Sequence, residues 1–182
     1  MARPSSKNAI LNAAEAIVIK SGAAHMTLDA VAKEAGVSKG GLMYNFPTKE
    51  ALLQAMIDRM VEHFEEIREE IKEEFPGESD NDLIIEMRIM QRESESKRRL
   101  SAALLAVVAN NPDLTKKTRE VMHQRFNTRV ATGHNAVRSS ILFFAAMGIQ
   151  LHSLLNLSML DDGQKEGIQR ELLRLASCDE DI

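Results

Sequence analysis

Aromatic residues are scarce in this sequence of 182 residues, which contains no tryptophan and in which aromatics make up only 4%. Hydrophobic residues nevertheless reach 44%, and ten of them are methionine. The core must therefore be built mainly from Leu, Ile, Ala and Met, a composition that favours helices over strands. We expect an all-α protein with about nine helices, divided into residues 1–47 and residues 48–182.

Cysteine is limited to Cys178, so no internal disulfide can form and a reducing cytoplasm suits the chain. A redox sensor is the less common alternative for such a thiol. Histidines are scattered and lack the short spacing of metal ligands, so we expect no metal and no cofactor. The histidines weighed for a metal site are His63, His123, His134 and His152.

Long apolar runs are also lacking. The first one is interrupted by Glu15, so we expect no secretory signal, and the run Ile141–Ile149 is too short to cross a bilayer. The sequence has no phosphate-cradling glycine loop, no nucleophile elbow and no acid pair in a recognisable setting. These absences predict a cytoplasmic chain with no membrane partner, no catalytic residues and no enzyme activity.

Charge is unevenly distributed along the chain. The net charge is −4, but residues 1–50 hold six Lys or Arg and four acids, a net of +2 that leaves −6 for the remainder. A basic head on an acidic body is the expected pattern of a small DNA-reading domain attached to another domain.

The stretch Thr27–Lys49 has the pattern of a helix-turn-helix. Thr27 can cap a short helix, Gly36 ends it in a turn that favours a positive φ, and Ser38 can cap a second helix over 39–45. A preceding helix over 6–20 completes a three-helix core, because two such short helices cannot close a core alone. Sequence therefore predicts a DNA-binding head that ends at Pro47.

The residues VSKGGLMYNFPTKEALL resemble the recognition helix and following helix of tetracycline-repressor-type (TetR-like) bacterial transcriptional regulators. In that family a Lys-Gly pair, a Leu, an aromatic pair, a Phe and a Lys-Glu recur in this order. The resemblance is specific over residues 8–60 and architectural beyond them. This sequence departs at Met43, where an aromatic is usual, and at Asn45, where a His is common.

The remaining chain reads as a series of amphipathic helices. Apolar spacing of one, three and four residues predicts helices over 49–75, 81–91, 100–110, 114–131, 136–157 and 164–176. Residues 92–99 are either a connecting loop or the exposed start of the next helix. The acids from Glu62 to Glu74 predict a solvated outer face, with a metal or cationic-ligand site as the rarer alternative.

The helix expected over 136–157 is apolar on nearly every side, which requires cover on every side. A body this small cannot supply that cover, so we expect a second copy of the chain to do so. The resemblance implies the same two-fold bundle of the last two helices. The residues assigned to this dimer interface are Phe143, Met147, Gly148, Leu151, Leu155, Ile168 and Leu172.

A dimer would place two recognition helices one turn of double-stranded DNA apart. Lys39 could donate to guanine, and Asn45 to a phosphate or a base edge. Phosphate contacts are expected from Thr27, Ser38, Tyr44 and Lys49. The alternatives are a packing aromatic for Tyr44 and a solvated lysine for Lys49. Gly40 and Gly41 either let the backbone approach the groove or mark a weak helix end.

The resemblance implies a repressor whose body binds an unidentified small-molecule effector and then releases a pseudo-palindromic operator. Flexible Met side chains suit an irregular cavity, although a Met stripe is more often plain core. The candidate cavity residues are Met60, Phe64, Met87, Met90, Leu104, Met122 and Phe126. The alternative is a helical dimer that serves as an architectural or protein-docking module without an effector.

Overall fold

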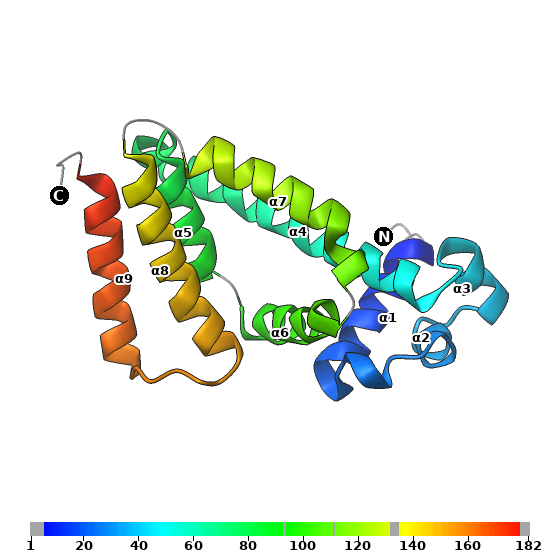
Figure 1. Cartoon of the computed structure of the whole chain (residues 1–182). Helices are drawn as coiled ribbons and strands as arrows, with labels where there is room; N and C mark the ends of the chain where they lie inside the picture. Colours follow the sequence, from blue (N-terminus) through cyan, green and yellow to red (C-terminus); the bar gives the residue numbers. More distant parts are fainter. Residues whose placement is uncertain (1–5, 93, 111, 132–134, 179–182) are drawn as a thin grey trace. The chain divides into compact units, whose positions relative to one another are not determined.

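Helices make up all the regular structure in the computed structural model, which describes residues 6–92, 94–110, 112–131 and 135–178 (Figure 1). In these ranges the α-helices are α1 (Ser6–Ser21), α2 (Leu28–Glu34), α3 (Lys39–Asn45), α4 (Lys49–Glu74), α5 (Asp82–Arg92), α6 (Glu95–Asn110), α7 (Lys116–Arg129), α8 (Ala136–Leu154) and α9 (Asp162–Ser177). Three 3₁₀ turns join them: η1 (Ala23–His25), η2 (Pro76–Glu78) and η3 (Pro112–Thr115). The all-α prediction is confirmed.

Side-chain caps start several of these helices. The hydroxyls of Thr27, Ser38 and Thr48 accept from the backbone N–H three residues later, at 3.2, 3.0 and 3.0 Å. Each cap satisfies an N–H that the first helical turn leaves without a partner. Gly36 ends α2 with a φ of 65°, a conformation that glycine adopts without steric cost.

Packing divides the chain into two compact units, which we call the head unit and the body unit. The head unit contains the described residues up to Glu62 and those of Glu95–Thr118. One continuous apolar cluster joins α1, α2, α3, the first half of α4 and α6. Ile10, Leu42 and Met56 are fully buried in it. The head unit therefore has a complete hydrophobic core.

The body unit contains His63–Ser94 and the described residues from Arg119 onward. Here α5, α8 and α9 pack against one another. One apolar cluster includes Leu83, Phe143 and Leu172, and a second lies between α4 and α5 around Ile71 and Ile85. The body core is thus built from two smaller clusters.

Several boundaries differ from the sequence predictions. Of the two alternatives for residues 92–99, the helical one holds from Glu95 onward. The first residues of the helix expected from Leu114 form η3, and α7 starts at Lys116. The expected helix over 136–157 ends at Leu154, because Asn156 takes a φ of 54° and the N–H of Leu157 returns to His152 O at 2.8 Å. Asn can end a helix in this way in place of Gly.

Helix α8 leaves most of its apolar surface uncovered. Leu142 and Phe143 are buried, whereas Val137, Ile141 and Phe144 are 76%, 63% and 57% exposed. By length and composition alone α8 could also cross a membrane, although a single such helix is weak evidence. Within the ranges that the structure describes, no other segment covers this face of α8.

Candidate functional site

The helix-turn-helix is held by apolar contacts on one side and is open on the other. Val31 and Ala32 of α2 and Leu42 of α3 are buried in the head core. Lys39 and Tyr44 lie on the exposed side of α3, and the Tyr44 side chain is 91% exposed. The core thus fixes α3 from behind and leaves its outer face available to a partner.

The two capping hydroxyls lie at the starts of α2 and α3. Thr27 and Ser38 are exposed, and each hydroxyl oxygen accepts one backbone hydrogen bond. An accepting hydroxyl keeps its own proton for donation. Both residues can therefore hold their helix and donate to an anion at once.

Lys39, the expected base-reading residue, forms an ion pair between the two helices. Its Nζ lies 2.9 Å from Oδ1 and 3.2 Å from Oδ2 of Asp29, which is the second residue of α2. The two side chains are 61% and 69% exposed. Sequence reasoning missed Asp29, because no local spacing rule relates a residue of α2 to one ten positions later in α3.

Three other predicted DNA contacts have distinct surroundings. Tyr44 is too exposed to be the packing aromatic that was its alternative. Asn45 Nδ2 donates back to Gly41 O at 2.9 Å, which leaves its second amide proton available. Lys49 is half-buried and its Nζ donates to Ala23 O at 3.2 Å, so it ties the start of α4 to η1 rather than standing free in solvent.

The two glycines of α3 differ in how much room a side chain would have. A Cβ built on Gly40 meets nothing within 4 Å, whereas one built on Gly41 comes within 3.2 Å of Ser38 Oγ. Gly41 therefore has a reason within the protein, since a side chain would crowd the cap. Nothing within the head explains Gly40.

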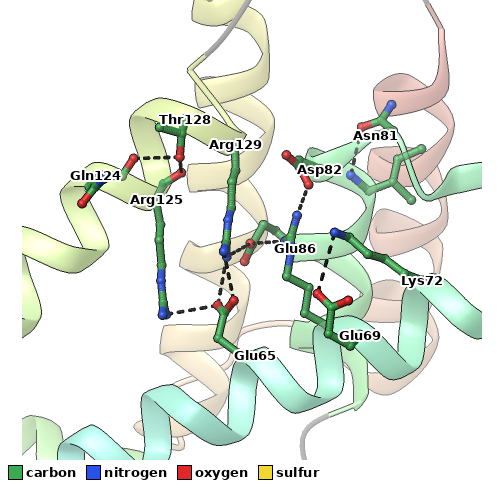
Figure 2. Close-up of polar contacts among 12 residues, drawn as sticks. Glu65, Glu69, Lys72, Asn81, Asp82, Glu86, Gln124, Arg125, Thr128 and Arg129 are labelled. Carbon is green, nitrogen blue, oxygen red and sulfur yellow. Dashed lines mark hydrogen bonds and ion pairs between the residues drawn. The ribbon is translucent and has the colours of Figure 1, made fainter.

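A network of charged side chains crosses α4, α5 and α7 in the body unit (Figure 2). Arg68 of α4 is 2% exposed, and its guanidinium donates to Asp82 and to Glu86 Oε1 of α5, the latter at 2.7 Å. Arg129 of α7 donates to both carboxylate oxygens of Glu65, each at 2.9 Å. The expectation of an entirely solvated acidic face on α4 is thus wrong for Glu65, because α7 covers it.

Burial and pairing shift the pKa values of this network in opposite directions. The hydrogen bonds from Arg129 lower the pKa of Glu65. Burial raises the pKa of Glu86 despite the neighbouring arginines, and burial also lowers the pKa of Arg68. Desolvation disfavours the charged form of both members of the Arg68–Glu86 pair, as expected for charges removed from water.

Two family models match the chain. Residues 10–56 match the model described as "Bacterial regulatory proteins, tetR family", and residues 84–177 match "Tetracyclin repressor-like, C-terminal domain". The chain belongs to the TetR family. TetR-family proteins are DNA-binding transcriptional regulators and are generally not enzymes.

Solved TetR-family structures share the fold over nearly the whole chain. A family member from Streptomyces coelicolor A3, SCO1917, is 22% identical with a TM-score of 0.72, covering 94% of this chain and 98% of its own. The multidrug binding protein EbrR complexed with ethidium is 22% identical with a TM-score of 0.68, covering 96% and 99%. Its malachite green complex is 23% identical with a TM-score of 0.65, covering 94% and 98%. A search of curated proteins found no significant match.

The residues assigned to a TetR dimer interface fall into two groups. Met147, Leu151, Leu155 and Ile168 are 38–47% exposed, and a Cβ on Gly148 would meet nothing within 4 Å. Phe143 and Leu172 are 9% and 8% exposed because they belong to the body core of their own chain. The second group would support the interface from behind rather than form its surface.

The cavity candidates are spread over different environments. In the head unit, Leu104 is buried in the core and the Met60 sulfur accepts from the Ser101 hydroxyl at 3.4 Å. In the body unit, Met87 and Met90 line a void of about 10 Å³, room for about one water. Met122, another cavity candidate, has a side chain that is 41% exposed. The outward turn of Met122 fits the polar composition of α7.

Phe64 and Phe126 have aromatic neighbours in the body unit. The Phe126 ring lies 5.4 Å from both Phe143 and Phe144, and the Phe64 ring lies 6.4 Å from His63.

His63, His123 and His152 lie on separate helices, and His134 falls outside the described residues. Among the described residues no three His, Cys, Asp or Glu side chains are grouped as metal ligands would be.

Proposed function

We propose that this TetR-family chain is a repressor that binds a pseudo-palindromic operator as a homodimer and leaves it when a small-molecule effector binds. The observation that carries the proposal is the uncovered stripe of α8. Its members recur every three or four residues: Val137, Ile141, Phe144, Gly148, Leu151 and Leu155. We call them the α8 stripe.

The α8 stripe has the spacing of a helix–helix contact. Residues three and four apart lie on one face of a helix, and an apolar seam of this kind pairs with an equal seam. Gly148 near its middle would let two helices approach closely, since no atom lies within 4 Å of its Cβ position. A second copy of the chain supplies an equal seam by symmetry, so a two-fold dimer is the simplest cover.

A two-fold dimer would present two α3 helices to half-sites about one DNA turn apart. Lys39 would then read a guanine, and Asn45 would contact a phosphate or a base edge. Thr27, Ser38, Tyr44 and Lys49 would hold phosphates. These contacts supply a base reader and several backbone anchors per half-site, a division typical of protein–DNA interfaces. Gly40 would let the α3 backbone approach the groove.

Release by a small molecule is supported by the fold shared with EbrR, described as a multidrug binding protein in complexes with ethidium and malachite green. Any effector must bind the DNA-free state better, and the loss of operator affinity cannot exceed that difference. The cavity would form in the body unit around candidates such as Met87, Met90 and Phe126, where the flexible Met thioethers can repack around a guest.

Footprinting of the DNA that flanks the chain's own gene tests the proposal. We expect protection of an inverted repeat by the full-length protein and loss of the two-fold pattern with Ile141→Glu, which places a charge in the α8 stripe. Salt-sensitive binding without a preferred site would contradict the repressor and favour the architectural alternative.

Native mass spectrometry of protein purified from cells tests the effector. A bound small molecule that is absent from the operator complex is the expected result. Equal occupancy in the free and operator-bound protein would contradict release by that molecule.

A further inference from the structure

We infer that Asp29 is a specificity-determining residue that directs Lys39 toward bases and away from phosphates. The inference rests on the proposed role of Lys39 in reading a base, and goes beyond it by assigning a function to an acid on the DNA-reading surface. The ion pair between α2 and α3 carries it: Lys39 Nζ lies 2.9 and 3.2 Å from the two carboxylate oxygens of Asp29.

The Asp29–Lys39 pair is attracted to DNA phosphates less than a free lysine is. DNA attracts proteins chiefly through its phosphates, and a free lysine on the reading surface gains affinity from any phosphate, whatever the sequence. Lys39 beside Asp29 forms a pair with no net charge, and the carboxylate repels a phosphate that approaches the ammonium. The pair therefore gains little from the DNA backbone.

Lys39 keeps hydrogen-bond donors for a base while it is paired with Asp29. An ammonium has three N–H groups, and the Asp29 carboxylate cannot occupy all of them. Guanine O6 and N7 are neutral acceptors, so the negative charge of Asp29 repels them far less than it repels a phosphate. The paired Lys39 thus keeps its ability to bind a base edge while losing its general attraction to DNA.

The ion pair also limits the conformations of the Lys39 side chain. A lysine side chain has four rotatable bonds and samples many conformations when free. The ion pair favours conformations in which Lys39 Nζ lies beside α2, so the remaining N–H groups start from fewer positions on the exposed side of α3. The base contact then requires less ordering at the moment of binding.

A matched pair of substitutions tests this role in the full-length protein. Asp29→Asn removes the charge that holds Lys39, and Glu34→Gln removes one charge from the exposed end of the same helix. Each variant is titrated against a duplex selected by the wild type from a random pool and against a scrambled duplex of equal length. The titrations run from 50 to 200 mM salt.

For Asp29→Asn we expect scrambled-duplex affinity to rise about threefold at the lower salt, with the salt dependence steeper by about one phosphate contact. Affinity for the selected duplex should rise less or fall, so the ratio of selected to scrambled binding declines. Single-base changes at the Lys39 guanine should matter less. Glu34→Gln should raise both affinities by a similar factor and leave the ratio unchanged.

Three outcomes would overturn the inference. One is an equal rise for both duplexes in Asp29→Asn, as in Glu34→Gln, because that would reduce Asp29 to general repulsion. Another is a further loss of base discrimination when Asp29→Asn is added to Lys39→Ala. An effect that acts through Lys39 must disappear once Lys39 is replaced. Failure of the wild type to select any duplex would remove the operator reading of the proposed function together with this inference.

Discussion

The head unit and the body unit solve the burial of apolar surface differently. In the head, one continuous cluster collects the apolar side chains of five helices, and its central residue Leu42 is fully buried. In the body, two smaller clusters are accompanied by the buried Arg68 and by the α8 stripe, whose Ile141 is 63% exposed. The head core is closed by described residues of one chain, whereas the body leaves the α8 stripe exposed.

This difference assigns different physical roles to the two regions. A self-contained apolar core gives a rigid frame on which a reading helix can be held in one position. A body with buried charges and an uncovered apolar face has more than one arrangement available, because both features depend on what packs against them. We infer that the head holds the reading helix in place and that association and response reside in the body.

The largest effect is expected from the buried arginine of the body. Arg68→Ala should lower the free energy of unfolding by about 3–5 kcal/mol, because it leaves the carboxylates of Asp82 and Glu86 without their buried partner. Urea unfolding followed by circular dichroism measures the change.

Arg68→Met provides the control for this prediction. Removing the guanidinium while keeping an apolar side chain of similar length should cost less than Arg68→Ala, and the double substitution with Glu86→Gln should recover part of the loss. Equal losses in the Ala and Met variants would show that the unpaired carboxylates, rather than lost volume, determine the effect, whereas a loss confined to the Ala variant would show that volume determines it.

The second prediction applies one type of substitution to both regions. Leu42→Ala should cost about 2–5 kcal/mol, as expected for truncation in a fully packed core. Ile141→Ala should change the stability of a protomer by at most about 0.5 kcal/mol, as for an exposed site. It should instead weaken self-association, measured by sedimentation over a dilution series. A fall in protomer stability without any change in association would contradict the assignment of the α8 stripe.

Local sequence rules predicted the head well because its structure depends on residues that are close in the chain. The caps at Thr27 and Ser38 and the positive φ of Gly36 each depend on a span of three or four residues. Apolar spacing left α4 as either one long helix or two nearly collinear ones, and the structure shows one helix over Lys49–Glu74. The division into residues 1–47 and 48–182 stays a functional prediction.

The charged network could not be predicted in the same way. Glu65 pairs with Arg129, which lies 64 positions away, and Arg68 with Glu86, 18 positions away. Both pairs depend on how α4, α5 and α7 pack, and an acidic run on a helix is normally solvated. The Asp29–Lys39 pair was missed for a similar reason, since it bridges two helices across the turn.

The third prediction separates the two readings of the α3 glycines. Gly40→Ala should stabilise the protein by up to about 1 kcal/mol, since alanine favours the helix and the Cβ meets no atom. It should nevertheless lower operator affinity by about tenfold, equivalent to about 1.4 kcal/mol, if the α3 backbone approaches the groove. Thermal unfolding and fluorescence anisotropy measure the two quantities.

Gly41→Ala is the matched control in the same helix. Its Cβ would press on Ser38 Oγ at 3.2 Å, so the helix gain should be reduced or lost. Unchanged operator affinity in a stabilised Gly40→Ala protein would identify Gly40 as a weak helix position without a role in DNA approach.

The smallest effect is expected in the pH dependence of stability, where the two glutamates of the network should act in opposite directions. The pKa of Glu65 is lowered from its ordinary 4.5 by the hydrogen bonds from Arg129, so its contribution is present above that value and is lost as the pH falls through the lowered pKa. The pKa of Glu86 is raised from 4.5 by burial, so the folded protein retains this proton to higher pH than the unfolded chain does. The contribution of Glu86 is therefore complete below 4.5 and declines as the pH rises through the raised pKa.

Glu65→Gln and Glu86→Gln isolate the two contributions. Urea unfolding across a pH series gives the free energy of unfolding of each protein. The wild-type value minus the variant value should rise with pH for Glu65→Gln and fall with pH for Glu86→Gln. If both of these free-energy differences rose with pH, Arg68 and Arg129 would stabilise the charged form of both carboxylates. In that case pairing with arginine, and not burial, would dominate the titration of Glu86 as well as that of Glu65.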